Sequence, residues 1–95
     1  MRETGRVRVL VVEDERRLAA AVKRGLEASG FAVDLAFDGV SGLHLAREGG
    51  YDGVVLDIML PGMSGYKVCE RLRDRQPVVL RVLVVDLHRV RAGQQ

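Results

Sequence analysis

The chain has 95 residues, of which 47% are hydrophobic and 29% are charged, and its formal net charge at pH 7 is +2. This length and balance predict one small globular domain and exclude a disordered chain. The net charge is too small to argue for nucleic-acid binding, and a single cysteine, Cys69, excludes a disulfide framework. Because no apolar run approaches membrane-spanning length and no signal peptide precedes Glu13, we expect a cytoplasmic protein.

The chain begins with a predicted strand and helix. Residues 7–12 form an apolar run that predicts a strand, and the acids Glu13 and Asp14 follow it directly. Residues 15–29 repeat apolar side chains every four positions, which predicts an amphipathic helix. Gly30 fits the left-handed conformation that commonly ends a helix.

Two further strand–helix units follow. Residues 31–37 alternate apolar side chains with small or polar ones, which predicts a second strand with one wetter face, near the edge of a sheet. Asp38 can cap a helix over residues 39–48. Residues 53–56 carry three consecutive apolar side chains, as expected of a strand covered on both faces in a parallel sheet. A third helix is predicted over about residues 65–74.

The segment after Pro77 has two interpretations. Residues 78–85 are rich in β-branched side chains and lie where a fourth strand is expected. Arg81 within this run is tolerable on an edge strand, where a charge discourages further pairing. A helix with Pro77 in its first turn is the alternative. We favour the strand.

The stretch from Tyr51 to Tyr66, YDGVVLDIMLPGMSGY, carries the candidate site. Asp57 stands at the carboxyl end of its predicted strand, where open α/β folds place their chemistry. Glu13 and Asp14 end another strand of the same parallel sheet, so the three carboxylates can lie within a few ångströms of one another. Gathered carboxylates raise each other's pKa unless a cation shares them, and oxygen-only ligands suit Mg²⁺.

Two motifs, VLVVEDE and later YDGVVLDIMLPGMSGYKVCERLR, resemble the receiver domain of two-component response regulators, of the kind attached to winged-helix transcription factors. The resemblance runs from about Arg6 to Arg75 and stops after Gln76. It implies an α/β fold with a flavodoxin-like (CheY-like) doubly wound parallel sheet of strand order 2-1-3-4-5. The sheet would be incomplete here, with about four strands and three helices. We expect a truncated receiver-like domain over residues 6–85 and a polar tail over residues 86–95.

The resemblance also implies roles for particular residues. Asp57 would accept a phosphoryl group from a sensor histidine kinase. Mg²⁺ would be held by Glu13, Asp14, Asp57 and the backbone carbonyl of Met59. The protein would act in a phosphorelay that regulates transcription and would not be an enzyme, since no second acid lies two residues after Asp57, as an aspartate-nucleophile phosphatase would need. We expect no DNA or membrane binding by this chain alone.

Some residues that the resemblance implies are missing. A receiver has a Ser or Thr after the fourth strand, a Lys after the fifth and an aromatic that reorients, but here the only Thr is Thr4 and no Ser follows Ser64. The only lysines are Lys23 and Lys67, on predicted helices. We therefore expect slow or lost phosphorylation. The alternative function is a non-switching, receiver-derived binding module that forms a homodimer or swapped oligomer through the exposed edge of strand four.

Two histidines are possible phosphoryl carriers or metal ligands. His44 lies in the middle of a predicted helix, with no acid placed to orient it, and His88 lies in the polar tail beside Arg89. Both positions are more typical of surface or structural histidines. The sequence therefore predicts neither residue in the site.

Overall fold

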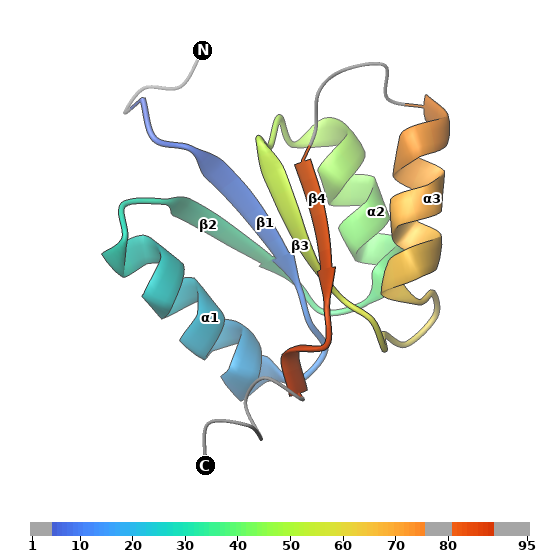
Figure 1. Ribbon diagram of the computed structural model, residues 1–95, viewed down its shortest axis with the longest axis horizontal. Coiled ribbons are helices and arrows are strands. Elements are labelled where there is room, and N and C mark those ends of the chain that lie inside the picture. The colour runs from blue at the N-terminus through green and yellow to red at the C-terminus, as the bar shows by residue number, and fades with distance from the viewer. Residues whose placement is uncertain (1–4, 76–80, 89–95) are drawn as a thin grey trace.

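The computed structural model describes residues 5–75 and 81–88. They form a four-stranded parallel sheet with strand order β2-β1-β3-β4 (Figure 1). In chain order the elements are β1 (Arg8–Val12), α1 (Arg16–Ala28), β2 (Ala32–Ala36), α2 (Gly39–Glu48), β3 (Gly53–Asp57), α3 (Gly65–Arg75) and β4 (Arg81–Val85). The predicted doubly wound α/β fold is confirmed. None of the helices in these two ranges is long and apolar enough to cross a bilayer.

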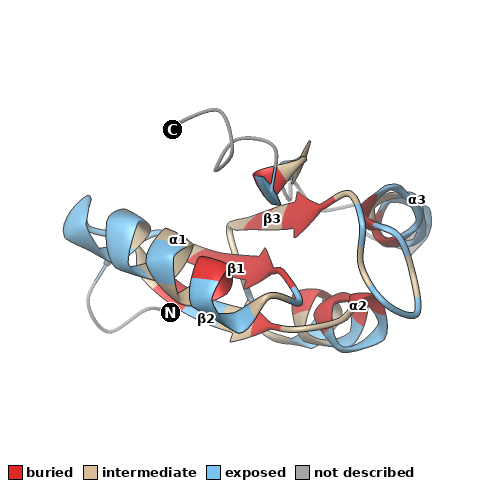
Figure 2. Ribbon diagram, turned by 90° about the horizontal axis from the view of Figure 1, so that it is seen from below, coloured by how far each residue is buried: buried red, intermediate tan, exposed pale blue. Residues whose placement is uncertain are grey.

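The two faces of the sheet are covered by different helices. Leu10 and Val12 of β1 pack in one buried cluster with side chains of α2 and α3, whereas Val9 and Val11 pack against α1. Figure 2 shows that buried residues concentrate on the strands and on the helix sides that face them. Alternate positions of one strand thus feed two core layers, which explains why the central strands are apolar on consecutive positions.

Local signals place the helix ends. Side-chain oxygens of Glu15 accept the N–H groups of Arg17 and Leu18 and so cap α1. Gly30, just beyond the end of α1, has a φ of 98°. The predicted caps Asp38 and Ser64 each accept a backbone N–H in the first turn of α2 and α3, respectively.

The fourth strand resolves the ambiguity after Pro77. Residues 81–85 pair in parallel with β3, from Gly53 opposite Arg81 to Asp57 opposite Val85. The helical alternative is therefore wrong for these residues, while residues 78–80 of the predicted strand lie outside the described residues. Arg81 is the first residue of β4 as described and is exposed, so its charge is not buried by the sheet.

The close approach of α3 to the end of β3 depends on Gly65. A Cβ added at Gly65 would overlap the carbonyl oxygen of Asp57. The N–H of Gly65 also donates to the carbonyl of Ile58 at 2.9 Å, so the backbone has little freedom to move away. Glycine at position 65 therefore allows the start of α3 to lie against the backbone of Asp57 at the end of β3.

We expect Gly65→Ala to destabilise the fold by about 1–3 kcal/mol, as overpacking commonly does. Gly25 is the matched control, since it lies in α1, is exposed, and an added Cβ there would meet no described atom within 4 Å. Gly25→Ala should stabilise by up to about 1 kcal/mol because alanine favours helix. Urea denaturation of both variants measures the difference, and shifts of the same sign would contradict the role assigned to Gly65.

Candidate functional site

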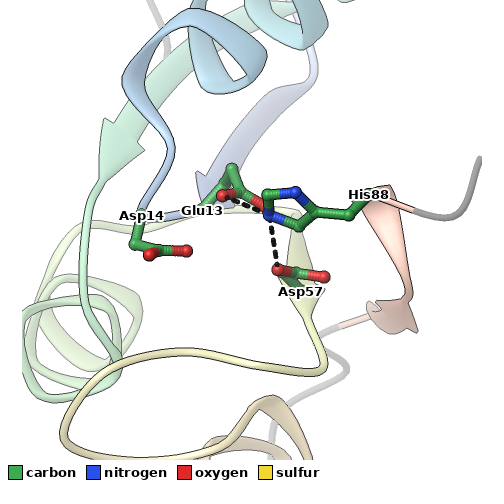
Figure 3. A group of neighbouring side chains, drawn as sticks. All are labelled: Glu13, Asp14, Asp57 and His88. Atoms are coloured by element: carbon green, nitrogen blue, oxygen red, sulfur yellow. Dashed lines mark hydrogen bonds and ion pairs between the residues drawn. The ribbon is translucent and has the colours of Figure 1, made fainter. Parts of the chain in front are cut away.

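Three carboxylates meet at the carboxyl ends of the two central strands (Figure 3). Glu13 and Asp14 follow β1 directly, and Asp57 is the last residue of β3. One ligand-capable atom from each carboxylate and one ring nitrogen of His88 all lie within 4.8 Å of one another. Because β1 and β3 are parallel neighbours in the sheet, the residues at their ends emerge side by side. The convergence expected of these acids is therefore present.

Two of the carboxylates are buried. Glu13 is 0% exposed and Asp57 is 1% exposed, whereas Asp14 is exposed to solvent. Within the described residues, Glu13 Oε1 and Asp57 Oδ2 are buried without any hydrogen-bond partner. Unpaired buried oxygens are costly, and two like charges side by side add to that cost. The arrangement suits a cation that would satisfy both oxygens.

In each buried carboxylate, the other oxygen accepts a hydrogen bond from a backbone amide. The N–H of Glu15 donates to Glu13 Oε2 at 2.6 Å, and the N–H of Leu87 donates to Asp57 Oδ1 at 3.1 Å. Each carboxylate is therefore held by one oxygen while the second lacks a hydrogen bond. Glu15 itself caps α1 and does not belong to the cluster.

His88 is a member of the cluster that the sequence interpretation missed. Its Nε2 lies 3.1 Å from Glu13 Oε2 and 3.5 Å from Asp57 Oδ2, and its side chain is 48% exposed. His88 is exposed, as expected, but its interpretation as a residue outside the site is wrong, because the chain after β4 brings it to the ends of the central strands. A signal was available, since His88 follows the last residue of a parallel strand by three positions, as site residues in such folds often do.

The charges of the cluster influence one another. Burial raises the pKa of Glu13 to about 7, and Asp57 acts in the same direction, whereas the hydrogen bond from the Glu15 amide opposes the rise. Burial lowers the pKa of His88, but the combined attraction of Glu13, Asp57 and Asp14 outweighs it, and the pKa of His88 is raised overall. Without a metal, the cluster thus resists ionisation of Glu13 and favours a positive charge on His88.

The remaining predicted site residue, Met59, lies in the loop after β3. Met59 is 76% exposed, and its role as a carbonyl ligand stays a prediction. Together with Asp14, it borders an open hollow of about 500 Å³ whose other lining residues are Ile58, Leu60, Pro61 and Ser64. His44 lies outside the cluster, as expected, on the exposed side of α2. The expectation that no acid is placed to orient it is wrong, since its Nδ1 lies 3.5 Å from Glu48 one helical turn away.

The chain matches the response regulator receiver domain family over residues 9–92, a range that continues beyond the end of the resemblance at Gln76. It is 39% identical over 89 residues to the transcriptional regulatory protein CusR of Escherichia coli K12, covering 90% of this chain and 39% of CusR. It is 48% identical over 79 residues to the transcriptional regulatory protein TcrA of Mycobacterium tuberculosis, covering 83% of this chain and 31% of TcrA. The chain thus spans well under half the length of these curated relatives.

Solved structures with a similar fold also include receiver domains and response regulators. The response regulator TrrA of Thermotoga maritima, in complex with Mg²⁺ and BeF, has a TM-score of 0.78 and 34% identity, with 81% of this chain and 66% of that chain covered. The receiver domain of a sensor histidine kinase from Pseudomonas aeruginosa, with magnesium coordinated in its active-site cleft, has a TM-score of 0.72 and 26% identity, with 76% and 59% covered. The sequence match, the fold and the position of the acids lead to one conclusion: this chain belongs to the response regulator receiver domain family.

Proposed function

We propose that this chain is the phosphoacceptor receiver of a two-component response regulator, phosphorylated on Asp57 by a sensor histidine kinase in the cytoplasm in a Mg²⁺-dependent reaction. The observation that carries the proposal is the pair of adjacent buried carboxylates, Glu13 and Asp57, each with one oxygen that has no hydrogen-bond partner in the described part of the chain. Burying one ion costs on the order of several kcal/mol, and the half-exposed His88 offers these two carboxylates at most one positive charge, so the pair favours a shared metal cation.

The donor set fits Mg²⁺. Carboxylate oxygens of Glu13, Asp14 and Asp57 would hold the ion, with the backbone carbonyl of Met59 as a further oxygen ligand. When bound, the ion would neutralise charge on the transferring phosphoryl oxygens. Asp14 is exposed beside the open hollow, which leaves that side of the site accessible to a phosphodonor.

Asp57 would supply the attacking oxygen. The amide of Leu87 donates to its Oδ1 and so orients the carboxylate. The new bond would join a carboxylate oxygen of Asp57 to phosphorus, while the bond between phosphorus and the donor breaks and its electron pair leaves with the donor. Because the phosphoryl group remains on Asp57 as the signal, the domain acts as a signalling component and not as an enzyme.

Acetyl phosphate with Mg²⁺ tests the proposal. The parent chain should gain the mass of one phosphoryl group, slowly because it lacks the Ser or Thr and the Lys of its family, and Asp57→Ala should gain none. Asp74→Ala is the control, since Asp74 is an exposed acid on α3 outside the cluster. Intact-mass spectrometry reads the gain, and circular dichroism shows that each variant is folded. A folded parent that never gains mass would refute the proposal.

A second candidate function, a non-switching module that forms a homodimer, is favoured by the edge strand β4. Among the described strands, β4 pairs only with β3, and its Leu83 is 60% exposed. Leu83 and Val82 also line an apolar hollow of about 460 Å³ beside β3. An open apolar edge favours pairing with another strand, and a second copy supplies one of identical register.

Light scattering at micromolar concentration tests this dimer. The parent should have twice the chain mass of 10.5 kDa, and Leu83→Glu should have the mass of a monomer, because a charge on an edge strand discourages pairing with another strand. Val40→Glu is the matched control, since Val40 is 57% exposed on α2, away from the edge, and this variant should stay dimeric. A well-folded monomeric parent would rule out this second function without affecting the first.

A further inference from the structure

The carboxylate cluster contains a nitrogen donor. Figure 3 shows the imidazole of His88 directed at the two buried carboxylates, with Nε2 nearest to them. This nitrogen lies 3.1 Å from Glu13 Oε2 and 3.5 Å from Asp57 Oδ2. Together with an oxygen of Asp14, the four ligand atoms lie within 4.8 Å of one another. A site for Mg²⁺ needs only oxygen ligands, so the function proposed above leaves His88 without a role.

The spacing of these atoms matches ligands that share one small metal ion. Two ligands each about 2.0–2.1 Å from a tetrahedral zinc ion lie about 3.3 Å apart, a value between the two His88 distances. An independent observation also points to a missing ligand. Asp57 Oδ2, the oxygen 3.5 Å from His88 Nε2, is buried and has no hydrogen-bond partner across residues 5–75 and 81–88. An ion between His88 Nε2 and Asp57 Oδ2 would supply the partner that this oxygen lacks.

We propose that this cluster binds a divalent transition-metal ion of the zinc class, with His88 Nε2 as the nitrogen ligand beside the carboxylates of Glu13 and Asp57. The inference rests on the proposed function in that the same carboxylates form a cation site, and it adds the ligand that sets metal preference. Imidazole suits zinc, copper, iron and nickel, whereas Mg²⁺ takes oxygen ligands and retains water. Accessible zinc sites have three protein ligands and one open position. Here the open position would lie beside Asp14, which is exposed.

The transition metal and Mg²⁺ would compete for one set of ligands. Both ions would use the carboxylates of Glu13 and Asp57. Bound Zn²⁺ is therefore expected to suppress Mg²⁺-dependent phosphorylation of the parent, while the same Zn²⁺ concentration should have a much smaller effect on His88→Ala. His88 would thus make the receiver sensitive to which divalent ion is present.

Zinc titration of tag-free protein tests the inference, with Cys69→Ser as the background so that the thiol cannot contribute. The parent should bind one Zn²⁺, and His88→Ala should bind it on the order of 100-fold more weakly, because loss of even an outer-shell partner costs about 10–100-fold. His44→Ala is the matched control and should be unchanged, since that histidine lies on α2 outside the cluster. The Mg²⁺ affinity of His88→Ala should equal or exceed that of the parent.

His88→Gln provides a second variant of similar polarity in case the alanine variant misfolds, and circular dichroism monitors both. Equal Zn²⁺ affinity of parent and folded His88 variants, or no binding by the parent, overturns the inference. Acetyl phosphate labelling with Mg²⁺ on the same samples separates it from the proposed function. If Asp57 is labelled but zinc binding does not depend on His88, only the inference is refuted. If zinc binding depends on His88 but Asp57 is not labelled, only the phosphoacceptor function is refuted.

Discussion

Replacing Glu13 by glutamine is expected to raise the free energy of unfolding of the metal-free chain at pH 8 by on the order of 2–3 kcal/mol, with a much smaller gain at pH 5. Burial raises the pKa of Glu13 from its usual 4.5 to about 7 in the folded chain. Between these pH values the folded chain retains a proton that the unfolded chain has lost. Stability therefore falls as the pH rises from about 4.5 to about 7, and the neutral amide of glutamine removes this loss.

The raised pKa of His88 likewise makes the folded chain lose stability as the pH rises. Its pKa is raised in the folded chain, so its contribution is fully present below its unfolded value of 6.5 and is lost as the pH rises through the folded pKa. Urea denaturation at pH 5 and pH 8 with a chelator measures both effects. Glu27→Gln, an exposed position on α1, is the control and should follow the parent. Parallel pH curves for Glu13→Gln and the parent would contradict the burial of a costly charge.

Magnesium chloride at 100 times its dissociation constant is expected to add about 2.7 kcal/mol to stability, which corresponds to a rise of roughly 10–20 °C in the melting temperature of a domain this small. The folded chain gathers the carboxylates and the unfolded chain does not, so only the folded chain binds the ion well. At one fixed magnesium concentration, the rise should be larger at pH 8 than at pH 5, since the ligands must be ionised.

Asp14→Asn and Asp57→Asn should each lose most of this thermal response, because each removes one negative ligand. Asp74→Asn, on the exposed side of α3, should retain it. Differential scanning fluorimetry across a magnesium titration makes the comparison. An unchanged response in Asp14→Asn would exclude that residue from the metal ligands while leaving Asp57 to be judged by its own variant.

Much of the fold could be predicted from the sequence because its signals are local. The caps at Asp38 and Ser64 and the left-handed Gly30 depend on residues within one turn, and consecutive apolar positions identify the covered strands. The sequence of β4 does not by itself decide between a strand and a helix. Its apolar side chains fit either a strand or a helix, and the parallel pairing with Gly53 to Asp57 of β3, nearly thirty residues earlier, determines the outcome.

The candidate site likewise has one part that could be predicted from the sequence and one part that could not. The three acids could be placed together because parallel strands end at one edge, a rule that needs only the strand assignments. The position of His88 depends on the turn after β4, where Leu87 is buried and its amide reaches Asp57. These are tertiary contacts that a single sequence does not display. Leu87, an apolar residue between two polar neighbours in an expected tail, was the available sign of an anchor.

The hydrogen bond from the Leu87 amide to Asp57 ties the far edge of the sheet to the acidic cluster through the main chain. Such a link is tolerant of evolutionary drift, since nearly every amino acid at position 87 still supplies an N–H, and only proline would delete it. If Asp57 is phosphorylated as proposed, this main-chain hydrogen bond would transmit a change at Asp57 to the end of β4. The amide resonance of Leu87 in a nitrogen-15 correlation spectrum would be the direct reporter of that coupling.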